Sequence, residues 1–292
     1  MTKPQRICWL AFNMLNNALP RYNLDRKIRE RKFQLSEQRL DELWNSIPQG
    51  ASPSRRLSEL FWLSLPWSAI LRQVGRINAL EIGCGSGAYG RLLERVLGTG
   101  LERYLGVDIE AHDQWTANVD RRLSFKVGRA GDAHRYLQGI NLILTQSALE
   151  HFEEDLLYFS QVSDFVKANK HPILQIHLIP TASCITTFPW HGIREYTPRT
   201  ISRITGLFCP ETLVYLFSLG GSRCNRTHRK YITWPHLWNG SDLRRSRMDD
   251  YRTSVRSAIL SDFQGRAASS AFYALVLNSN CESDPFAQGL GA

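Results

Sequence analysis

The sequence predicts an α/β fold in which a doubly wound, mainly parallel sheet carries helices on both faces. Two observations predict it. From residue 77 onward, short apolar runs alternate with segments whose apolar residues recur at helical spacing. One run, at residues 140–145, is apolar almost throughout, as a strand buried on both faces should be. The connections are short, so right-handed crossover helices are expected between successive parallel strands.

Seven strands are expected in this part of the chain. They lie at residues 77–82, 103–107, 123–127, 140–145, 172–179, 213–219 and 271–277. Helices are expected at residues 89–97 and 153–168, each with one apolar side. A further helix should begin at Thr197-Pro198, because threonine caps helices and proline suits the first helical position.

The first 75 residues are predicted to be helical. Four apolar residues follow helical spacing after Ser36, and Ser52-Pro53 is typical of the start of another helix. We therefore divide the chain into a helical N-terminal extension at 1–75 and an α/β domain at 76–292. A basic, aromatic-rich insert is expected at about 220–265.

The composition fits a folded globular chain, since 43% of the 292 residues are hydrophobic and 22% are charged. The net charge of +9 is unevenly distributed: residues 1–50 carry +4, residues 51–180 carry zero and residues 181–292 carry +5. Basic flanks favour an anionic partner, such as RNA, anionic lipid or a phosphorylated molecule. The segment 222–258, with nine basic and three acidic residues among aromatic ones, fits either single-stranded RNA binding or a solvated helical face.

The strongest motif is Leu80-Glu-Ile-Gly-Cys-Gly-Ser-Gly87, which follows a predicted strand and precedes a predicted helix. Its glycines allow a tight turn and a close approach of the backbone to a ligand. The alternative is a tight turn between strand and helix that binds no ligand. The glycines at 85, 87 and 90 also fit the dinucleotide pattern G-x-G-x-x-G, so a nicotinamide-dependent oxidoreductase is a further alternative.

The acid two residues before Gly83 separates these alternatives. With it, the stretch resembles motif I of the class I S-adenosylmethionine-dependent methyltransferases, a Rossmann-like family. Three later stretches resemble further motifs of that family, after the second, third and fourth strands. The resemblance covers about residues 76–180 and the last strand, and it implies S-adenosylmethionine as cofactor. The acids after the second and third strands would meet the ribose hydroxyls and the adenine amino group. The implied cofactor-binding residues are Glu81, Gly83, Cys84, Gly85, Gly87, Asp108, Ile109, Asp132, Ala133 and Gln146.

Leu149-Glu150-His151 resembles the motif that faces the transferred methyl group. His151 is the candidate general base, with Glu150 orienting it, and a purely structural role as a helix start stays open. Some quinone O-methyltransferases use Glu-x-x-Glu-His here to hold a divalent metal. In this chain Ser147 stands at the first position, so no metal is expected.

A second polar cluster lies in the segment 190–199, after the fifth strand. His191 is the second candidate base, and Arg194 and Tyr196 are candidate ligands for polar or anionic acceptor groups. The alternative is a loop that packs on the core, with Arg194 in an ion pair.

Together these features predict a methyltransferase for a small-molecule or saccharide-type acceptor, with oxygen as the expected methylated atom. An anionic or lipid-linked acceptor fits the basic flanks. The alternatives are an RNA methyltransferase, although no Asn/Asp-Pro-Pro-Tyr motif follows the fourth strand, and a cofactor-binding interaction subunit without catalysis. No apolar stretch approaches about 20 residues, so a cytoplasmic protein is expected, with peripheral membrane association left open.

Overall fold

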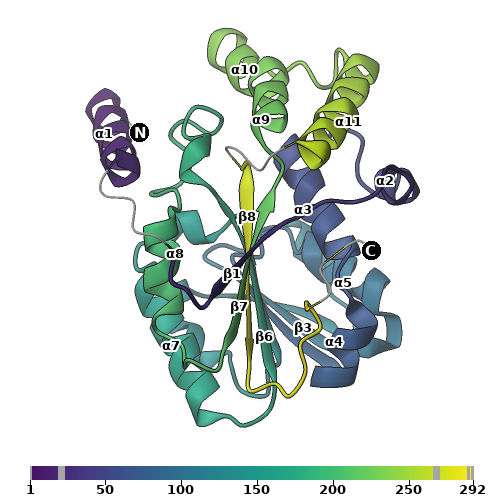
Figure 1. Cartoon of the computed structure of the whole chain (residues 1–292), viewed down its shortest axis with the longest axis vertical. Coiled ribbons are helices and arrows are strands. Elements are labelled where there is room, and N and C mark those ends of the chain that lie inside the picture. Colours follow the sequence, from purple (N-terminus) through teal and green to yellow (C-terminus); the bar gives the residue numbers. More distant parts are fainter. Residues whose placement is uncertain (1, 19–23, 266–269, 288–289, 291–292) are drawn as a thin grey trace.

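The computed structural model of the chain describes residues 2–18, 24–265, 270–287 and 290, with the side chains of residues 16–18 excepted. These residues form three layers, with one sheet between two sets of helices. Figure 1 shows α7 (Asp155–Ala168) and α8 (Pro198–Thr205) on one face of the sheet, and α3 (Pro53–Leu63), α4 (Trp67–Val74) and α5 (Ala88–Leu97) on the other. This is the predicted α/β architecture.

The sheet has eight strands in the order β1-β7-β8-β6-β5-β2-β3-β4. Only β8 is antiparallel to its neighbours, β6 and β7. The seven predicted strands are all present, each within two residues of the expected bounds. The strands are β1 (Ile28–Lys32), β2 (Ile77–Ile82), β3 (Leu101–Asp108), β4 (Leu123–Val127), β5 (Leu142–Gln146), β6 (Ile173–Pro180), β7 (Leu213–Leu219) and β8 (Phe272–Ser279).

The strand order reverses beside β2. After β2 the chain adds β3 and β4 on one side, and it then crosses over to add β5 and β6 on the other. β5 and β6 are buried along their whole length, which explains their nearly unbroken apolar sequences. Such a reversal leaves a crevice at the carboxyl ends of the adjacent strands, where open α/β sheets bind ligands.

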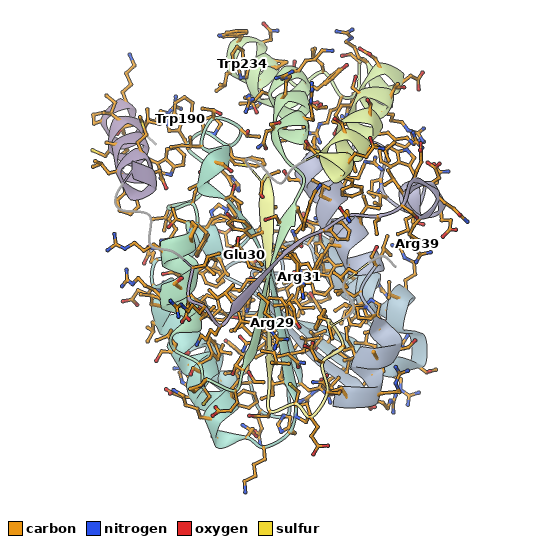
Figure 2. All side chains as sticks on the ribbon, in the orientation of Figure 1. Arg29, Glu30, Arg31, Arg39, Trp190 and Trp234 are labelled. Carbon is orange, nitrogen blue, oxygen red and sulfur yellow. The ribbon has the colours of Figure 1, made fainter. Side chains whose placement is uncertain are left out.

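The prediction that residues 1–75 are wholly helical is wrong at β1, which pairs in parallel with the edge strand β7. Its sequence, Ile-Arg-Glu-Arg-Lys, has one buried apolar residue, Ile28, and so carries no strand pattern. Figure 2 shows the side chains of Arg29, Glu30 and Arg31 on β1, which crosses in front of the other strands in this view. Charged side chains on an edge strand discourage pairing with another chain.

The predicted helix starts are confirmed. The Ser36 and Ser52 hydroxyls each accept a hydrogen bond from a backbone N–H three residues on, and Thr197 forms a capping box with Thr200. None of the described helices is both long and apolar enough to cross a membrane. The remaining helices are α1 (Lys3–Ala18), α2 (Glu37–Trp44), α6 (Gln114–Asn118), α9 (Ser222–His228), α10 (Trp234–Asn239) and α11 (Met248–Gln264).

The insert and the N-terminal segment pack together. The Tyr251 hydroxyl of α11 donates a 2.6 Å hydrogen bond to the Ala51 carbonyl, just before α3. Phe33, directly after β1, and Phe217 of β7 both make edge-to-face ring contacts with Phe61 of α3. The N-terminal segment is therefore part of the core that supports the sheet, and the division at residue 75 stays a prediction.

Candidate cofactor and acceptor site

A cavity of about 1080 Å³ opens at the carboxyl ends of the strands around the reversal. Its wall comes from the loops after β2, β3, β4 and β5 and from α3. This volume is at the upper end of the usual range for ligand pockets, so it has room for a nucleoside-containing cofactor. Eight of the ten predicted cofactor residues line it: Glu81, Gly83, Cys84, Gly85, Asp108, Ile109, Asp132 and Gln146.

The other two predicted cofactor residues lie behind the wall. Ala133 is fully buried in the core under the sheet. Gly87 has a φ of +80°, and a Cβ there would lie 2.3 Å from the Phe125 ring. Ala133 packs the turn after β4 into the core, and Gly87 packs the loop after β2 against Phe125. Neither residue lines the cavity.

The glycines of the loop after β2 have different surroundings. Gly83 and Gly85 both have positive φ, at +77° and +50°. A Cβ at Gly83 would lie 2.3 Å from the Ala148 Cβ, whereas a Cβ at Gly85 would meet nothing within 4 Å. Gly83 therefore lets two loops of the protein pack closely, and Gly85 leaves open space at the cavity.

Asp108, at the end of β3, fixes the glycine loop. Its carboxylate accepts a 2.7 Å hydrogen bond from the Gly85 N–H and a 2.8 Å bond from the Ile109 N–H. On the other side, the Trp115 indole donates a 2.7 Å hydrogen bond to the Gly85 carbonyl. Asp108 and Trp115 therefore fix the conformation of the glycine loop through hydrogen bonds within the protein.

Glu81 is a buried carboxyl group at the end of β2. Burial raises its pKa to about 8, against the lowering effects of a hydrogen bond from the Tyr104 hydroxyl and of the Arg55 charge. At neutral pH the ligand-free protein therefore keeps most of Glu81 protonated. A cation placed beside Glu81 would favour its ionised form.

The cavity wall is acidic, although the whole chain has a net charge of +9. Two arginines, Arg55 and Arg129, face six carboxyl groups there. Ile109, which is 68% exposed, gives the wall an apolar surface on which a planar group could lie. The six carboxyl groups are Glu81, Asp108, Glu110, Asp132, Glu153 and Glu154. The wall suits a ligand that carries positive charge.

Sequence reasoning missed Arg55, which reaches the cavity from α3. Its guanidinium lies 4.5 Å from the centroid of the Tyr89 ring and forms a 2.6 Å ion pair with Glu59. The Ser52 cap predicted the helix that carries Arg55. Nothing in the sequence indicates which end of the sheet this helix covers.

Glu150, His151 and His191 lie together next to the cavity. Glu150 and His151 form a short 3₁₀ turn (Leu149–His151) after β5, and His191 comes from the loop after β6. The His151 and His191 rings are nearly perpendicular, with centroids 4.8 Å apart. His151 lines the cavity, and burial lowers its pKa. Glu150 lies 3.5 Å from the His191 Nε2 atom, so its closest imidazole partner is His191 and not the predicted His151.

A second buried carboxyl group, Glu195, lies behind this cluster. Burial and the nearby charge of Glu150 raise the pKa of Glu195 to about 9. The loop comes this close because Gly192 has a φ of +67°, and a Cβ there would lie 2.8 Å from the Glu150 carbonyl oxygen. Glu195 was not among the predicted site residues, because an isolated loop glutamate matches no motif.

Arg194 and Tyr196 do not line the cavity. Tyr196 is fully buried, and its hydroxyl lies 3.1 Å from the Leu149 carbonyl and 3.0 Å from the Asp155 carboxylate. Arg194 forms a 2.7 Å ion pair with the same Asp155 and donates to the Glu153 carbonyl. These contacts tie the loop to the start of α7, which favours the packing alternative over substrate binding.

No protein-family model matches the sequence, and no curated protein sequence matches it. Among solved structures, the chain is similar to the plantazolicin methyltransferase BamL in complex with a triazolic desmethylPZN analog and SAH. The TM-score is 0.51 at 13% identity, over 83% of this chain and 88% of that one. It is also similar to SAM-dependent methyltransferases from Archaeoglobus fulgidus (TM-score 0.47, 14% identity, 84% and 100% covered) and Mesorhizobium loti (TM-score 0.45, 13% identity, 75% and 97% covered). The likeness to BamL confirms the predicted fold, which is the Rossmann-like fold of the class I methyltransferases.

Proposed function

We propose that the chain is an S-adenosylmethionine-dependent methyltransferase that methylates an oxygen of a small-molecule or saccharide-type acceptor. One observation carries the proposal. In a methyltransferase fold, an acidic cavity lies at the strand ends, with Asp108 bound to the glycine loop. The cofactor has a cationic sulfonium and a cationic amino group, and both suit that cavity.

We assign the parts of the cofactor to three strand ends. Glu81, after β2, would face the cationic methionine part, which would favour its ionised form. Asp108, after β3, would bind the ribose hydroxyls with the oxygen capacity left by its two backbone hydrogen bonds. Asp132, in the turn after β4, would meet the adenine amino group, and Ile109 would lie against the purine.

The same charges argue against a dinucleotide cofactor. A pyrophosphate group carries two negative charges, and the cavity wall has six carboxyl groups against two arginines. The Gly85 N–H, which could bind a phosphate, donates to Asp108 instead. The acidic wall and the engaged Gly85 N–H therefore disfavour the nicotinamide alternative.

Methyl transfer to oxygen is an in-line displacement. A lone pair of the acceptor oxygen forms the new O–C bond, the S–C bond breaks with its electron pair on sulfur, and the hydroxyl proton leaves. The protein aligns the two molecules and excludes water. His151 lines the cavity, and its lowered pKa favours the unprotonated imidazole, so we assign it as the proton acceptor; His191 is the second candidate.

The surface around this site supports an acceptor presented at an anionic membrane. The Trp9 indole of α1 binds the Gly192 carbonyl, and Thr233, just before α10, binds the Thr187 carbonyl, so both helices flank the loop after β6. Figure 2 shows Trp190 in that loop beside α1, and Trp234 on α10 at the same end of the molecule. Exposed apolar residues cover these helices: Ile7, Leu10, Phe12, Met14 and Leu15 on α1, and Trp234, Leu237 and Trp238 on α10. Basic residues such as Lys3, Arg6 and Lys230 accompany them, a combination typical of interfacial helices.

Calorimetric titration with S-adenosylmethionine tests the cofactor. We expect one saturable site that Asp108→Ala removes, while Asp113→Ala, an exposed acid outside the cavity wall, leaves it intact. Binding of a nicotinamide cofactor in place of S-adenosylmethionine would overturn the proposal.

Transfer of a labelled methyl group into fractionated extract tests the acceptor. Label in glycan, lipid-linked or small-molecule fractions supports the proposed class. Label in RNA alone would move the chain to the RNA methyltransferases. If no fraction is labelled although the cofactor binds, the chain would be a cofactor-binding subunit without catalysis.

A further inference from the structure

Glu150 and Glu195 are two buried carboxyl groups with no hydrogen-bond partner. Both side chains are essentially inaccessible to solvent, and none of their four oxygens accepts a hydrogen bond from the residues that the structure describes. The nearest side-chain cation to Glu150 is His191, whose Nε2 atom lies 3.5 Å from a Glu150 oxygen. A buried carboxyl group without a hydrogen-bond partner either stays protonated or is paired with a cation or metal ion.

Three ligand atoms surround the space in front of Glu150. One atom from each of Glu150, His151 and His191 lies within 4.8 Å of the others. We infer that these three residues form a binding site for a divalent transition-metal ion. Ligand atoms about 2.0–2.2 Å from an ion stand about 3–4 Å apart, so the site needs only a small closure. The half-exposed His191 side chain has the freedom to supply it.

The donor set selects the kind of ion. Two imidazoles and one carboxylate suit manganese, iron, cobalt or zinc, whereas magnesium and calcium prefer oxygen ligands throughout. Three protein ligands leave further coordination positions open. Since His151 lines the cavity, those positions would face the space that the acceptor is proposed to occupy.

Glu195 would support the ion without binding it directly. It is buried on the same loop as His191, four residues farther along the chain. Groups around the first ligands commonly tune metal affinity. Gly192 makes this arrangement possible, because only glycine leaves room for the loop against Glu150.

This inference replaces the expectation of no metal that rested on Ser147. In the Glu-x-x-Glu-His motif of the quinone O-methyltransferases, the first glutamate precedes the Glu-His pair by three residues. Ser147 stands at that position here and offers no carboxylate. The fold supplies a ligand from 40 residues farther along the chain, since His191 reaches the turn from the loop after β6.

Only the chemical role of the metal ion rests on the proposed function; the binding of the ion does not. A bound ion would polarise the acceptor oxygen and ease loss of its proton. With the lone pairs of both imidazoles bound to the ion, His151 and His191 would orient it, and the acceptor proton would pass to solvent water. Metal binding itself needs no cofactor, and it can be measured without any methyl transfer.

Metal titration of the full chain tests the site. Protein stripped with a chelator is titrated with Co²⁺ and with Mn²⁺, and the metal content is measured after gel filtration. We expect one equivalent of metal, visible absorption bands of Co²⁺ bound to nitrogen and oxygen ligands, and a rise in the melting temperature. Glu150→Gln and His191→Ala should each weaken binding at least a hundredfold. His236→Ala, an exposed histidine on α10, should leave it unchanged.

The Glu150→Gln variant also separates a metal ligand from a structural residue. Without metal, the variant keeps the size of the buried side chain and should be about as stable as the wild type, and metal should no longer raise its melting temperature. Absence of a stoichiometric metal, or binding that survives both Glu150→Gln and His191→Ala, would overturn the inference. If S-adenosylmethionine still binds in that case, the proposed function stands without the metal.

Discussion

Gly83 and Gly85 provide a matched pair that separates a glycine needed for folding from a glycine needed for the ligand. Both have positive φ, so alanine costs each about 1–2 kcal/mol of backbone strain. At Gly85 this is the whole cost, because a Cβ there meets nothing within 4 Å. At Gly83 the new methyl group would overlap the Ala148 Cβ at 2.3 Å, and overpacking adds about 1–3 kcal/mol.

These free energies convert into melting temperatures. A chain of 292 residues loses roughly 1.6 °C per kcal/mol, so Gly85→Ala should melt about 2–3 °C lower and Gly83→Ala about 3–8 °C lower. For the affinity of the ligand, we expect the larger loss at Gly85. Gly85→Ala places a methyl group at the open cavity wall and should weaken binding of S-adenosylhomocysteine about tenfold or more.

Differential scanning calorimetry and titration calorimetry on the same preparations measure both quantities. Wild-type affinity in Gly85→Ala would show that the ligand does not approach this part of the loop. Equal melting temperatures for the two variants would refute the steric assignment of Gly83.

The remaining predictions concern protons, packing and the surface. The pKa of Glu81, raised by burial to about 8, means that the ligand-free native state keeps a proton that the unfolded state loses above pH 4.5, so stability should fall as pH rises from 4.5 to 8. Cofactor binding at pH 7 should then release close to one proton, measured as a buffer-dependent heat, and Glu81→Gln should abolish the release; a heat independent of buffer would contradict this. Burial lowers the pKa of His177 to about 3, so stability should also fall as pH drops from 6.5 towards 3, and His177→Gln should flatten urea-unfolding free energies over that range; an unchanged acid slope would count against it. Tyr196→Phe should cost about 1–2 kcal/mol in stability with unchanged S-adenosylhomocysteine affinity, because its hydroxyl satisfies buried acceptors; a higher acceptor KM with unchanged stability would restore the substrate role. Joint replacement of Trp234 and Trp238 by alanine should lower the affinity for phosphatidylglycerol vesicles ~10-fold, whereas Val119→Ala, the exposed control, should leave it unchanged. If the double variant binds the vesicles as tightly as the wild type, the membrane is removed from the proposal.

The fold was predictable because its signals are local. β5 and β6 are buried on both faces, so their sequences are apolar runs that no surface helix would carry. The caps at Ser52 and Thr197 act within one helical turn and are visible in the sequence. Eight of the ten predicted cofactor residues line the cavity for the same reason, since each lies at or after the end of a strand.

The missed features depend on contacts between distant segments. β1 has only one buried apolar residue, because an edge strand can carry charge on all its other positions. Arg55 reaches the cavity because α3 covers one end of the sheet, and no pattern within α3 encodes that position. Glu195 follows the same rule, since an isolated glutamate in a loop gives no sign that it will be buried beside Glu150.

The chain has a net charge of +9, but its acidic and basic side chains are concentrated in different parts of the fold. The cavity wall gathers six carboxyl groups around the proposed cationic cofactor, and β2, β3, β4 and β5 with the loops that follow them bring these groups together from the neutral middle of the chain. The excess of basic residues lies in the two flanks, which supply α1 on one side of the loop after β6 and α9 to α11 on the other. Exposed charges are screened over about 8 Å at physiological ionic strength, so a basic surface can coexist with an acidic cavity. An anionic acceptor would be attracted first to the flanks and would reach the methyl group past His151 and His191, the one part of the site that comes from both the neutral middle and a basic flank.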